Sequence, residues 1–172
     1  MAKKNSAIDS RRVTGAPSEE DLFGEELRYL RCANSLVFKQ GTALVEVLQR
    51  MREASAGGVL IVDKNDKTRL AGIFTARDIL DKIAGQNVQE KTIDEYMTTE
   101  TRVLTVENTV GDAIRLMTEG GYRHVPLVDL EGEINGMVSV RDIVEYIAEH
   151  FPEEVYNLPP NFDQRAQTPE GG

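Results

Sequence analysis

The sequence has few of the residues from which disulfides and zinc sites are built. Its 172 residues contain one cysteine, Cys32, and two histidines, His124 and His150. A single cysteine cannot form an internal disulfide, and a zinc site would need carboxylates to complete its ligand set. We therefore expect neither an internal disulfide nor a structural metal ion.

Long apolar runs and an excess of basic residues are also missing. The longest apolar run, Val59 to Val62, falls far short of the roughly 20 residues that span a bilayer, and the charged N-terminus precedes no apolar stretch of a secretory signal. The 20 Lys and Arg residues stand against 29 Asp and Glu residues, which gives a net charge of −9. Nucleic-acid binding needs a basic surface. We expect no membrane segment, no nucleic-acid partner and a cytoplasmic location.

The two ends of the chain differ in composition from its centre. Residues 1–20 lack periodic apolar positions and are expected to form a disordered arm. Residues 21–34 are expected to form a helix that enters the core. Four of the six prolines fall within residues 149–172, where they forbid a continuing helix or a central strand, so this segment is expected to be a proline-rich tail.

The centre of the chain contains an internal repeat. The segment Gly72 to Ile83 matches Gly136 to Ile147, 64 residues later, and shares with it a Gly, a Thr or Ser, and an Arg-Asp-Ile run. Further upstream the spacing is 66, which aligns Leu44 to Met51 with Val110 to Met117. The two-residue difference falls in a polar turn, where an insertion leaves strand pairing intact. We assign the first repeat to residues 35–98 and the second to residues 99–148.

Each repeat is expected to fold as β-α-β-β-α. The first helix of each has apolar residues at positions i, i+3, i+4 and i+7, and short apolar runs predict the strands. The expected strands are 36–39, 59–62 and 71–74 in the first repeat and 103–106, 125–128 and 134–138 in the second, and the expected second helices are 76–83 and 140–148. A unit of about 50 residues buries too little surface to be stable alone. The sequence therefore predicts an α/β (α+β) fold in which two pseudo-symmetric repeats pack as one module.

The third strand of each repeat leads into the second helix through the same kind of corner. The corner residues are Thr75, Arg77 and Asp78 in the first repeat and Ser139, Arg141 and Asp142 in the second. A Thr or Ser with Asp three residues later forms a capping box, which needs no ligand. However, a hydroxyl, a guanidinium and free helix N–H groups also suit a phosphate, and a carboxylate suits the vicinal hydroxyls of a ribose. The doubled corner is therefore a candidate ribose-phosphate site, and capping would fix its geometry.

The repeat, its corners and the run from Tyr122 to Asp129 resemble a tandem pair of cystathionine-β-synthase (CBS) domains, the Bateman module, over about residues 35–148. The resemblance implies adenosine-containing ligands in clefts between the repeats. By the same resemblance, the aspartates would hold the ribose, and the hydroxyls and arginines of the corners would face phosphate. The residues that it implies for the adenine pocket, in part through their backbone atoms, are Gly58, Val59, His124, Val125 and Pro126. The first repeat departs from the family pattern, because Gly57-Gly58 stands where the second repeat has Arg123-His124.

The resemblance implies a stand-alone regulatory protein rather than an enzyme. It would bind AMP, ADP or ATP, with or without Mg²⁺, form a homodimer and report occupancy to an effector protein on another chain. No catalytic cofactor is expected, since the P-loop and dinucleotide-binding motifs are absent and no Gly-x-Ser-x-Gly elbow surrounds Ser139 to support a triad with His124 and Asp142. The alternatives are a structural dimerisation or adaptor protein without a ligand, and a sensor of S-adenosylmethionine or a cyclic dinucleotide.

Overall fold

Two three-stranded sheets form the centre of the fold in the computed structural model, which describes residues 23–30, 32 and 35–150. The first sheet has the order β1 (Val37–Lys39), β2 (Gly58–Val62), β3 (Leu70–Thr75), and the second has the order β4 (Leu104–Thr105), β5 (His124–Val128), β6 (Ile134–Ser139). In each sheet the first strand is parallel to the central strand, and the third is antiparallel to it. The repeat predicted from the sequence is confirmed in the topology.

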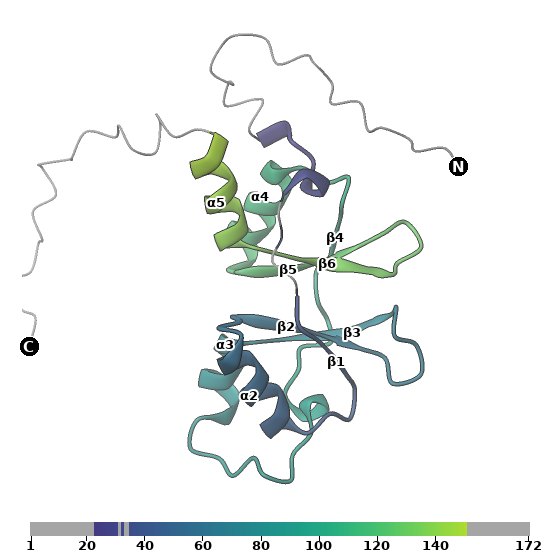
Figure 1. The fold of residues 1–172 in the computed structure, drawn as a ribbon, viewed down its shortest axis with the longest axis vertical. Coiled ribbons are helices and arrows are strands. Elements are labelled where there is room, and N and C mark those ends of the chain that lie inside the picture. The colour runs from purple at the N-terminus through teal and green to yellow at the C-terminus, as the bar shows by residue number, and fades with distance from the viewer. Residues whose placement is uncertain (1–22, 31, 33–34, 151–172) are drawn as a thin grey trace, which may run out of the picture.

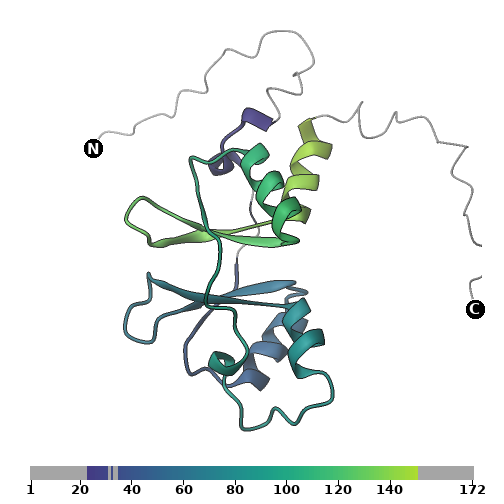
Figure 2. The same cartoon turned by 180° about the vertical axis from the view of Figure 1, so that it is seen from behind.

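Helices cover the outer faces of the two sheets, which lie face to face (Figure 1, and from behind in Figure 2). Helices α2 (Leu44–Glu53) and α3 (Ala76–Asp78) lie on the first sheet, and α4 (Val110–Gly120) and α5 (Val140–His150) lie on the second. Every residue of β2 is buried, as expected for a strand covered on both faces. The predicted fold class, two β-α-β-β-α repeats packed as one module, is confirmed. No helix in the described ranges has the length and apolar character that a membrane span requires.

The sheets contact each other through side chains and through backbone hydrogen bonds. Leu60, Ile73 and Met137 pack together between them. At the hairpin ends, Arg69 and Glu133 form an antiparallel bridge, and the N–H of Ile134 donates to the carbonyl of Thr68 at 2.8 Å. The two repeats therefore share one interface rather than lying as separate domains.

Each repeat is completed by a short segment that precedes the first strand of the other repeat. The 3₁₀ turn Leu27–Tyr29 places Leu27 in the core of the second repeat, and the 3₁₀ turn Ile93–Glu95 places Ile93 in the core of the first. The carbonyl of Glu25 accepts from the first N–H of α4, and the carbonyl of Lys91 accepts from the first N–H of α2, both at 2.8 Å. These bonds satisfy N–H groups that a helix start leaves unpaired. The two segments are 66 residues apart and follow the repeat.

Three details differ from the elements predicted. The sequence predicts a helix over residues 21–34, but the described part of this segment contains the 3₁₀ turn Leu27–Tyr29, because the N–H groups of Leu27 and Arg28 donate to the carbonyls of Asn108 and Val106 instead of continuing a helix. The predicted helix 76–83 changes after Asp78 into a π-helical turn, Ile79–Ile83. Helix α5 continues to His150, past the expected boundary at 148. The predicted arm 1–20 and residues 151–172 of the predicted tail lie outside the described residues.

Candidate functional site

The two corners have the same local geometry. The Asp78 Oδ2 atom accepts from the N–H of Thr75 at 2.8 Å and from its hydroxyl at 2.7 Å. The Asp142 Oδ2 atom accepts from the N–H of Ser139 at 2.7 Å and from its hydroxyl at 2.6 Å. Both aspartates are 8% exposed. Each corner therefore uses one carboxylate oxygen for capping, as the capping-box pattern predicts, and holds the other, Oδ1, in a fixed orientation.

Two clefts open between the repeats, one beside each corner. The cleft beside Asp142, here called the Asp142 cleft, has a volume of about 600 Å³, and the cleft beside Asp78, the Asp78 cleft, has a volume of about 540 Å³. Small-molecule sites commonly enclose roughly 300–1,000 Å³. Both clefts therefore have room for a nucleotide.

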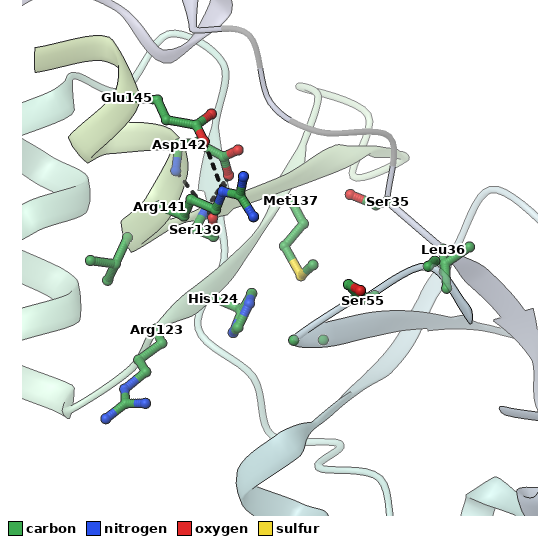
Figure 3. Close-up of a pocket in the computed structure, with 15 residues that line it drawn as sticks. Ser35, Leu36, Ser55, Arg123, His124, Met137, Ser139, Arg141, Asp142 and Glu145 are labelled. Carbon is green, nitrogen blue, oxygen red and sulfur yellow. Dashed lines mark hydrogen bonds and ion pairs between the residues drawn. The ribbon is translucent and has the colours of Figure 1, made fainter. Parts of the chain in front are cut away.

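The Asp142 cleft draws its walls from both repeats (Figure 3). Its residues are Ser35, Leu36, Ala54, Ser55, Ala56, Gly57 and Gly58 of the first repeat and Arg123, His124, Met137, Ser139, Val140, Arg141, Asp142 and Glu145 of the second. Figure 3 shows Ser55 and Leu36 facing His124 and Met137 across the cleft. The Arg141 Nε atom donates to Glu145 Oε1 at 2.7 Å, which orients the guanidinium along α5. A carboxylate, a hydroxyl and a guanidinium thus border one wall of the cleft.

The Asp78 cleft is the pseudo-symmetric counterpart. Its residues are Gly57, Ile73, Thr75, Ala76, Arg77, Asp78, Leu80 and Asp81 from the first repeat, and Thr98, Glu100, Thr101, Arg102, Gly121, Tyr122, Arg123 and His124 from the linker and the second repeat. The linker is here the segment of residues 96–103, between the 3₁₀ turn Ile93–Glu95 and β4. Arg77 Nη1 donates to the carbonyl of Gly121 at 3.0 Å and so connects the two repeats. Burial raises the pKa of Asp78, but hydrogen bonds from Lys82 and Thr75 outweigh it and hold the pKa below its usual value. Asp78 is therefore ionised at neutral pH.

His124 lies where the two clefts meet and lines both of them. Burial lowers its pKa; the Asp142 carboxylate opposes this shift and the charge of Arg123 adds to it. The imidazole is therefore neutral at neutral pH and offers one donor and one acceptor. Arg123 also lines both clefts, and Figure 3 shows its side chain extending away from Asp142.

The structure brings most of the predicted site residues together and leaves three out. The corner residues and His124 and Gly58 border the clefts. Val59 and Val125 do not, because alternation along a strand turns their side chains into the cores beneath the helices. Pro126 is buried and is also absent from both linings. For these three residues, the adenine-pocket role that the resemblance implies stays a prediction, and it would depend on backbone atoms rather than on side chains.

Sequence reasoning missed the cleft residues that lie outside the corners. Ser35 and Leu36 line the Asp142 cleft, and their counterparts 66 residues later, Thr101 and Arg102, line the Asp78 cleft. The same spacing relates the loop after α2 to the loop after α4. The repeat itself was therefore the signal that would have found them. Within the described ranges, no three His, Cys, Asp or Glu side chains are grouped in a way that would hold a metal ion.

Comparison with known proteins identifies the same family in both halves of the chain. The model of the CBS domain matches residues 33–85 and again residues 93–149. The chain is 34% identical over 117 residues to the mitochondrial CBS domain-containing protein CBSX3 of Arabidopsis thaliana, a match that covers 66% of this chain and 56% of that protein. Over the first curated relatives, the match spans only 52–63% of the relative's own length.

Solved structures share the fold at low identity. A CBS domain protein from Pyrobaculum aerophilum complexed with AMP is 19% identical, with a TM-score of 0.64 over 72% of this chain and 98% of that one. A CBS domain pair in complex with 5′-methylthioadenosine and S-adenosyl-L-methionine is 22% identical, with a TM-score of 0.63 over 72% of this chain and 96% of that one.

Proposed function

The chain belongs to the CBS domain family, and from this premise we propose that it is a regulatory module that binds an adenosine-containing ligand in the clefts between its repeats. The relatives of similar fold that are complexed with AMP, and with 5′-methylthioadenosine and S-adenosylmethionine, support this ligand class. The proposed role is regulatory rather than catalytic, and its output passes to an effector protein.

The observation that carries the proposal is the pair of capped aspartates, one bordering each cleft. Oδ2 of each aspartate is already used by the corner, so the orientation of Oδ1 is set before a ligand arrives. The 2′ and 3′ hydroxyls of a ribose would donate to this carboxylate, as they do to acidic residues in dinucleotide folds. Preorganisation of this kind improves affinity, because little side-chain entropy is lost on binding.

Basic side chains at the clefts suit the phosphate of the ligand. Arg141 and Arg123 line the Asp142 cleft, and Arg77, Arg102 and Arg123 line the Asp78 cleft. A guanidinium binds phosphate with charge-assisted hydrogen bonds. The chain as a whole is acidic, so these arginines supply positive charge where an anionic ligand needs it. Between the clefts, the neutral imidazole of His124 is placed to meet a base.

Calorimetric titration tests the proposal directly. AMP, ADP, ATP with and without Mg²⁺, S-adenosylmethionine and a cyclic dinucleotide would each be titrated into the protein, and we expect AMP, ADP or ATP to bind well below about 1 mM, that is, with more than roughly 4 kcal/mol. The double variant Asp78→Asn with Asp142→Asn keeps a capping oxygen at each corner but loses the carboxylates, and should bind at least about tenfold more weakly. Glu119→Gln on the exposed surface of α4 is the matched control. Flat titrations for every compound would overturn the proposal.

A second candidate function is a structural adaptor without a ligand. The observation that favours it is that both corners satisfy their capping hydrogen bonds within the chain. In that case the double variant would change the melting temperature, but no compound in the panel would raise it. A ligand that binds only the folded state must raise it.

We also propose that the module forms a homodimer through the helices that follow the two corners. Leu80 and Val144, which are 64 residues apart and therefore equivalent in the two repeats, are 74% and 56% exposed. Their helical segments lie along one side of the molecule (Figures 1 and 2). Exposed apolar side chains at equivalent positions suit a two-fold interface, in which the same surface is used by both copies. Changes in packing across this interface would report occupancy to the effector.

A further inference from the structure

Ser55, which follows α2, has a backbone conformation that favours glycine. Its φ is +52°, and it is the only residue other than glycine with a positive φ in the part of the chain that the structure describes. In this left-handed region the Cβ atom comes too close to the following carbonyl oxygen, so most residues with a side chain are disfavoured there. Ser55 therefore holds backbone strain.

The strain arises from the way in which α2 ends. The N–H of Ser55 donates to the carbonyl of Arg52 at 3.2 Å, and the N–H of Ala56 donates to the carbonyl of Met51 at 2.9 Å. This pair of bonds is a Schellman motif, in which the residue at the position of Ser55 is usually glycine. A serine at this position satisfies the hydrogen bonds of the motif but not its conformational preference.

In the second repeat the equivalent helix end has glycine at this position. Gly121, 66 residues after Ser55, has a φ of +66°, and the N–H of Tyr122 donates to the carbonyl of Met117 at 3.0 Å. Asparagine and aspartate adopt the left-handed conformation when their side chains form a local hydrogen bond. The hydroxyl of Ser55, in contrast, forms no hydrogen bond with any other residue of the described segments. Nothing in the fold itself therefore accounts for a serine at residue 55.

The position of Ser55 in the Asp142 cleft provides a functional reason for this strain. Strained residues cluster at binding and active sites, and Figure 3 shows Ser55 and Leu36 on one side of this cleft, with His124 and Met137 on the other. A purine base has apolar faces and a polar edge. Leu36 and Met137 offer apolar contact to the faces, and the Ser55 hydroxyl offers a donor and an acceptor to the edge.

We infer that Ser55 is a ligand contact of the Asp142 cleft: its hydroxyl hydrogen-bonds the polar edge of the purine base, and serine stands at a position that suits glycine because of this contact. The inference rests on the proposed function and adds to it a residue that binds the base. Stability and binding then make opposite demands on residue 55. A change to glycine relieves the backbone strain but also removes the hydroxyl that the ligand needs.

Two variants of residue 55 test this inference by thermal unfolding without ligand and by calorimetric titration with AMP and ATP. The titrations are made in an Asp78→Asn background, so that they report on the Asp142 cleft. Ser55→Gly should raise the melting temperature by about 2–4 °C, because the strain is relieved. It should also weaken nucleotide binding by about three- to tenfold, as one lost hydrogen bond does. Ser55→Ala keeps the strain and loses the hydroxyl, so it should weaken binding to the same extent with little change in melting temperature.

Two further variants serve as controls for the backbone effect. Gly121→Ser is the reciprocal change and should lower the melting temperature by a similar amount, since a Cβ atom there would meet only the Arg77 Nη1 atom, at 3.9 Å. Ala54→Gly introduces glycine at a φ of −87°, where there is no strain to relieve, and should lower the melting temperature.

The possible outcomes separate this inference from the proposed function. Ser55→Gly that leaves nucleotide affinity unchanged, or that does not raise the melting temperature, would overturn the inference alone. Loss of all binding in the Asp78→Asn background, when the wild type binds, would do the same, because the ligand would then not lie in the Asp142 cleft. Failure of both nucleotides to bind the wild type would overturn the proposed function and the base contact with it.

Discussion

The imidazole of His124 lies against the backbone of Gly57 in the other repeat, so closely that a Cβ atom at residue 57 would stand 2.9 Å from both Cε1 and Nε2. The next residue, Gly58, is the counterpart of His124, since the two are 66 residues apart and each opens the central strand of its sheet. One repeat thus supplies the imidazole at the junction of the clefts, and the other supplies the space for it.

We predict that Gly57→Ala destabilises the protein because the new methyl group displaces His124. Overpacking of this kind costs roughly 1–3 kcal/mol. The same substitution in a His124→Ala background should cost close to nothing, because the clash is removed. Urea unfolding of the two single variants and the double variant measures this coupling. If Gly57→Ala lowers the stability equally in both backgrounds, contact with His124 is not the reason that residue 57 must be glycine.

The stability of the protein should fall at mildly acidic pH because of His124. Burial lowers its pKa in the folded state below the ordinary value of 6.5, so that below this pH the unfolded chain binds a proton that the folded chain does not. The unfolding free energy is therefore highest above about pH 6.5 and decreases as the pH falls toward the folded-state pKa. Urea unfolding at about pH 7.5 and about pH 5.5 should show a larger loss for the wild type than for His124→Gln. Equal losses would contradict this prediction.

Gly72 is predicted to tolerate no side chain, because the linker crosses its strand there. A Cβ atom at residue 72 would lie 2.6 Å from the carbonyl oxygen of Thr98, whose backbone forms two hydrogen bonds with Ile73. A backbone group fixed on both sides cannot move aside as a flexible side chain can, so Gly72→Ala should cost at least about 1–3 kcal/mol. Gly24→Ala, which would meet no atom within 4 Å, is the control. The comparison is made by thermal and urea unfolding.

Leu27→Ala should destabilise the second repeat although residue 27 precedes the first. Leu27 is 1% exposed and packs with Val110 and Met117, so its truncation removes buried contacts worth about 2–5 kcal/mol. Tyr29, in the same turn, is 63% exposed, and Tyr29→Ala should change stability by less than about 0.5 kcal/mol. Hydrogen exchange should show the loss of protection in α4 and β5 as well as in the turn. Similar stabilities of the two variants would mean that the segment does not contribute to the core.

The proposed homodimer can be tested by introducing a charge into its interface. Leu80→Glu and Val144→Glu each place a carboxylate, twice per dimer, in an interface that would bury it, and should shift the protein toward monomer in light scattering after size exclusion. Leu130 is 82% exposed at the tip of the second hairpin and provides the control as Leu130→Glu. Because Leu80 also lines the Asp78 cleft, the result for Val144→Glu separates assembly from ligand binding. A wild type that is monomeric at all concentrations would overturn the dimer proposal.

Local patterns in the sequence were sufficient to predict the elements and the corners. The strands lie within one or two residues of their expected positions, because short apolar runs bounded by polar turns have few other conformations available. The capping bonds of Thr75 and Ser139 follow from the spacing to Asp78 and Asp142, which places a side chain over the first helical turn. These features depend on residues that are close in the sequence.

The features that could not be predicted depend on distant residues. Nothing near Leu27 indicates that its N–H will donate to Asn108. The 3₁₀ turn, and the packing of Leu27 in the core of the second repeat, are therefore visible only in the structure. The ion pair between Lys82 and Asp78 has an ordinary helical spacing, but its anchoring by the carbonyl of Tyr96 depends on where the linker runs.

The 3₁₀ turns Leu27–Tyr29 and Ile93–Glu95, each of which precedes one repeat's first strand and packs in the other repeat's core, constrain the order in which the chain can fold during synthesis. The core of the first repeat is incomplete until Ile93 and Tyr96 have left the ribosome, and Leu27, although made early, has no core to enter until α4 and β5 exist. Domains normally fold as units from the N-terminus during translation. We therefore expect the earliest described segment to dock late, with Leu27 and Leu30 exposed on the nascent chain until α4 and β5 have been made.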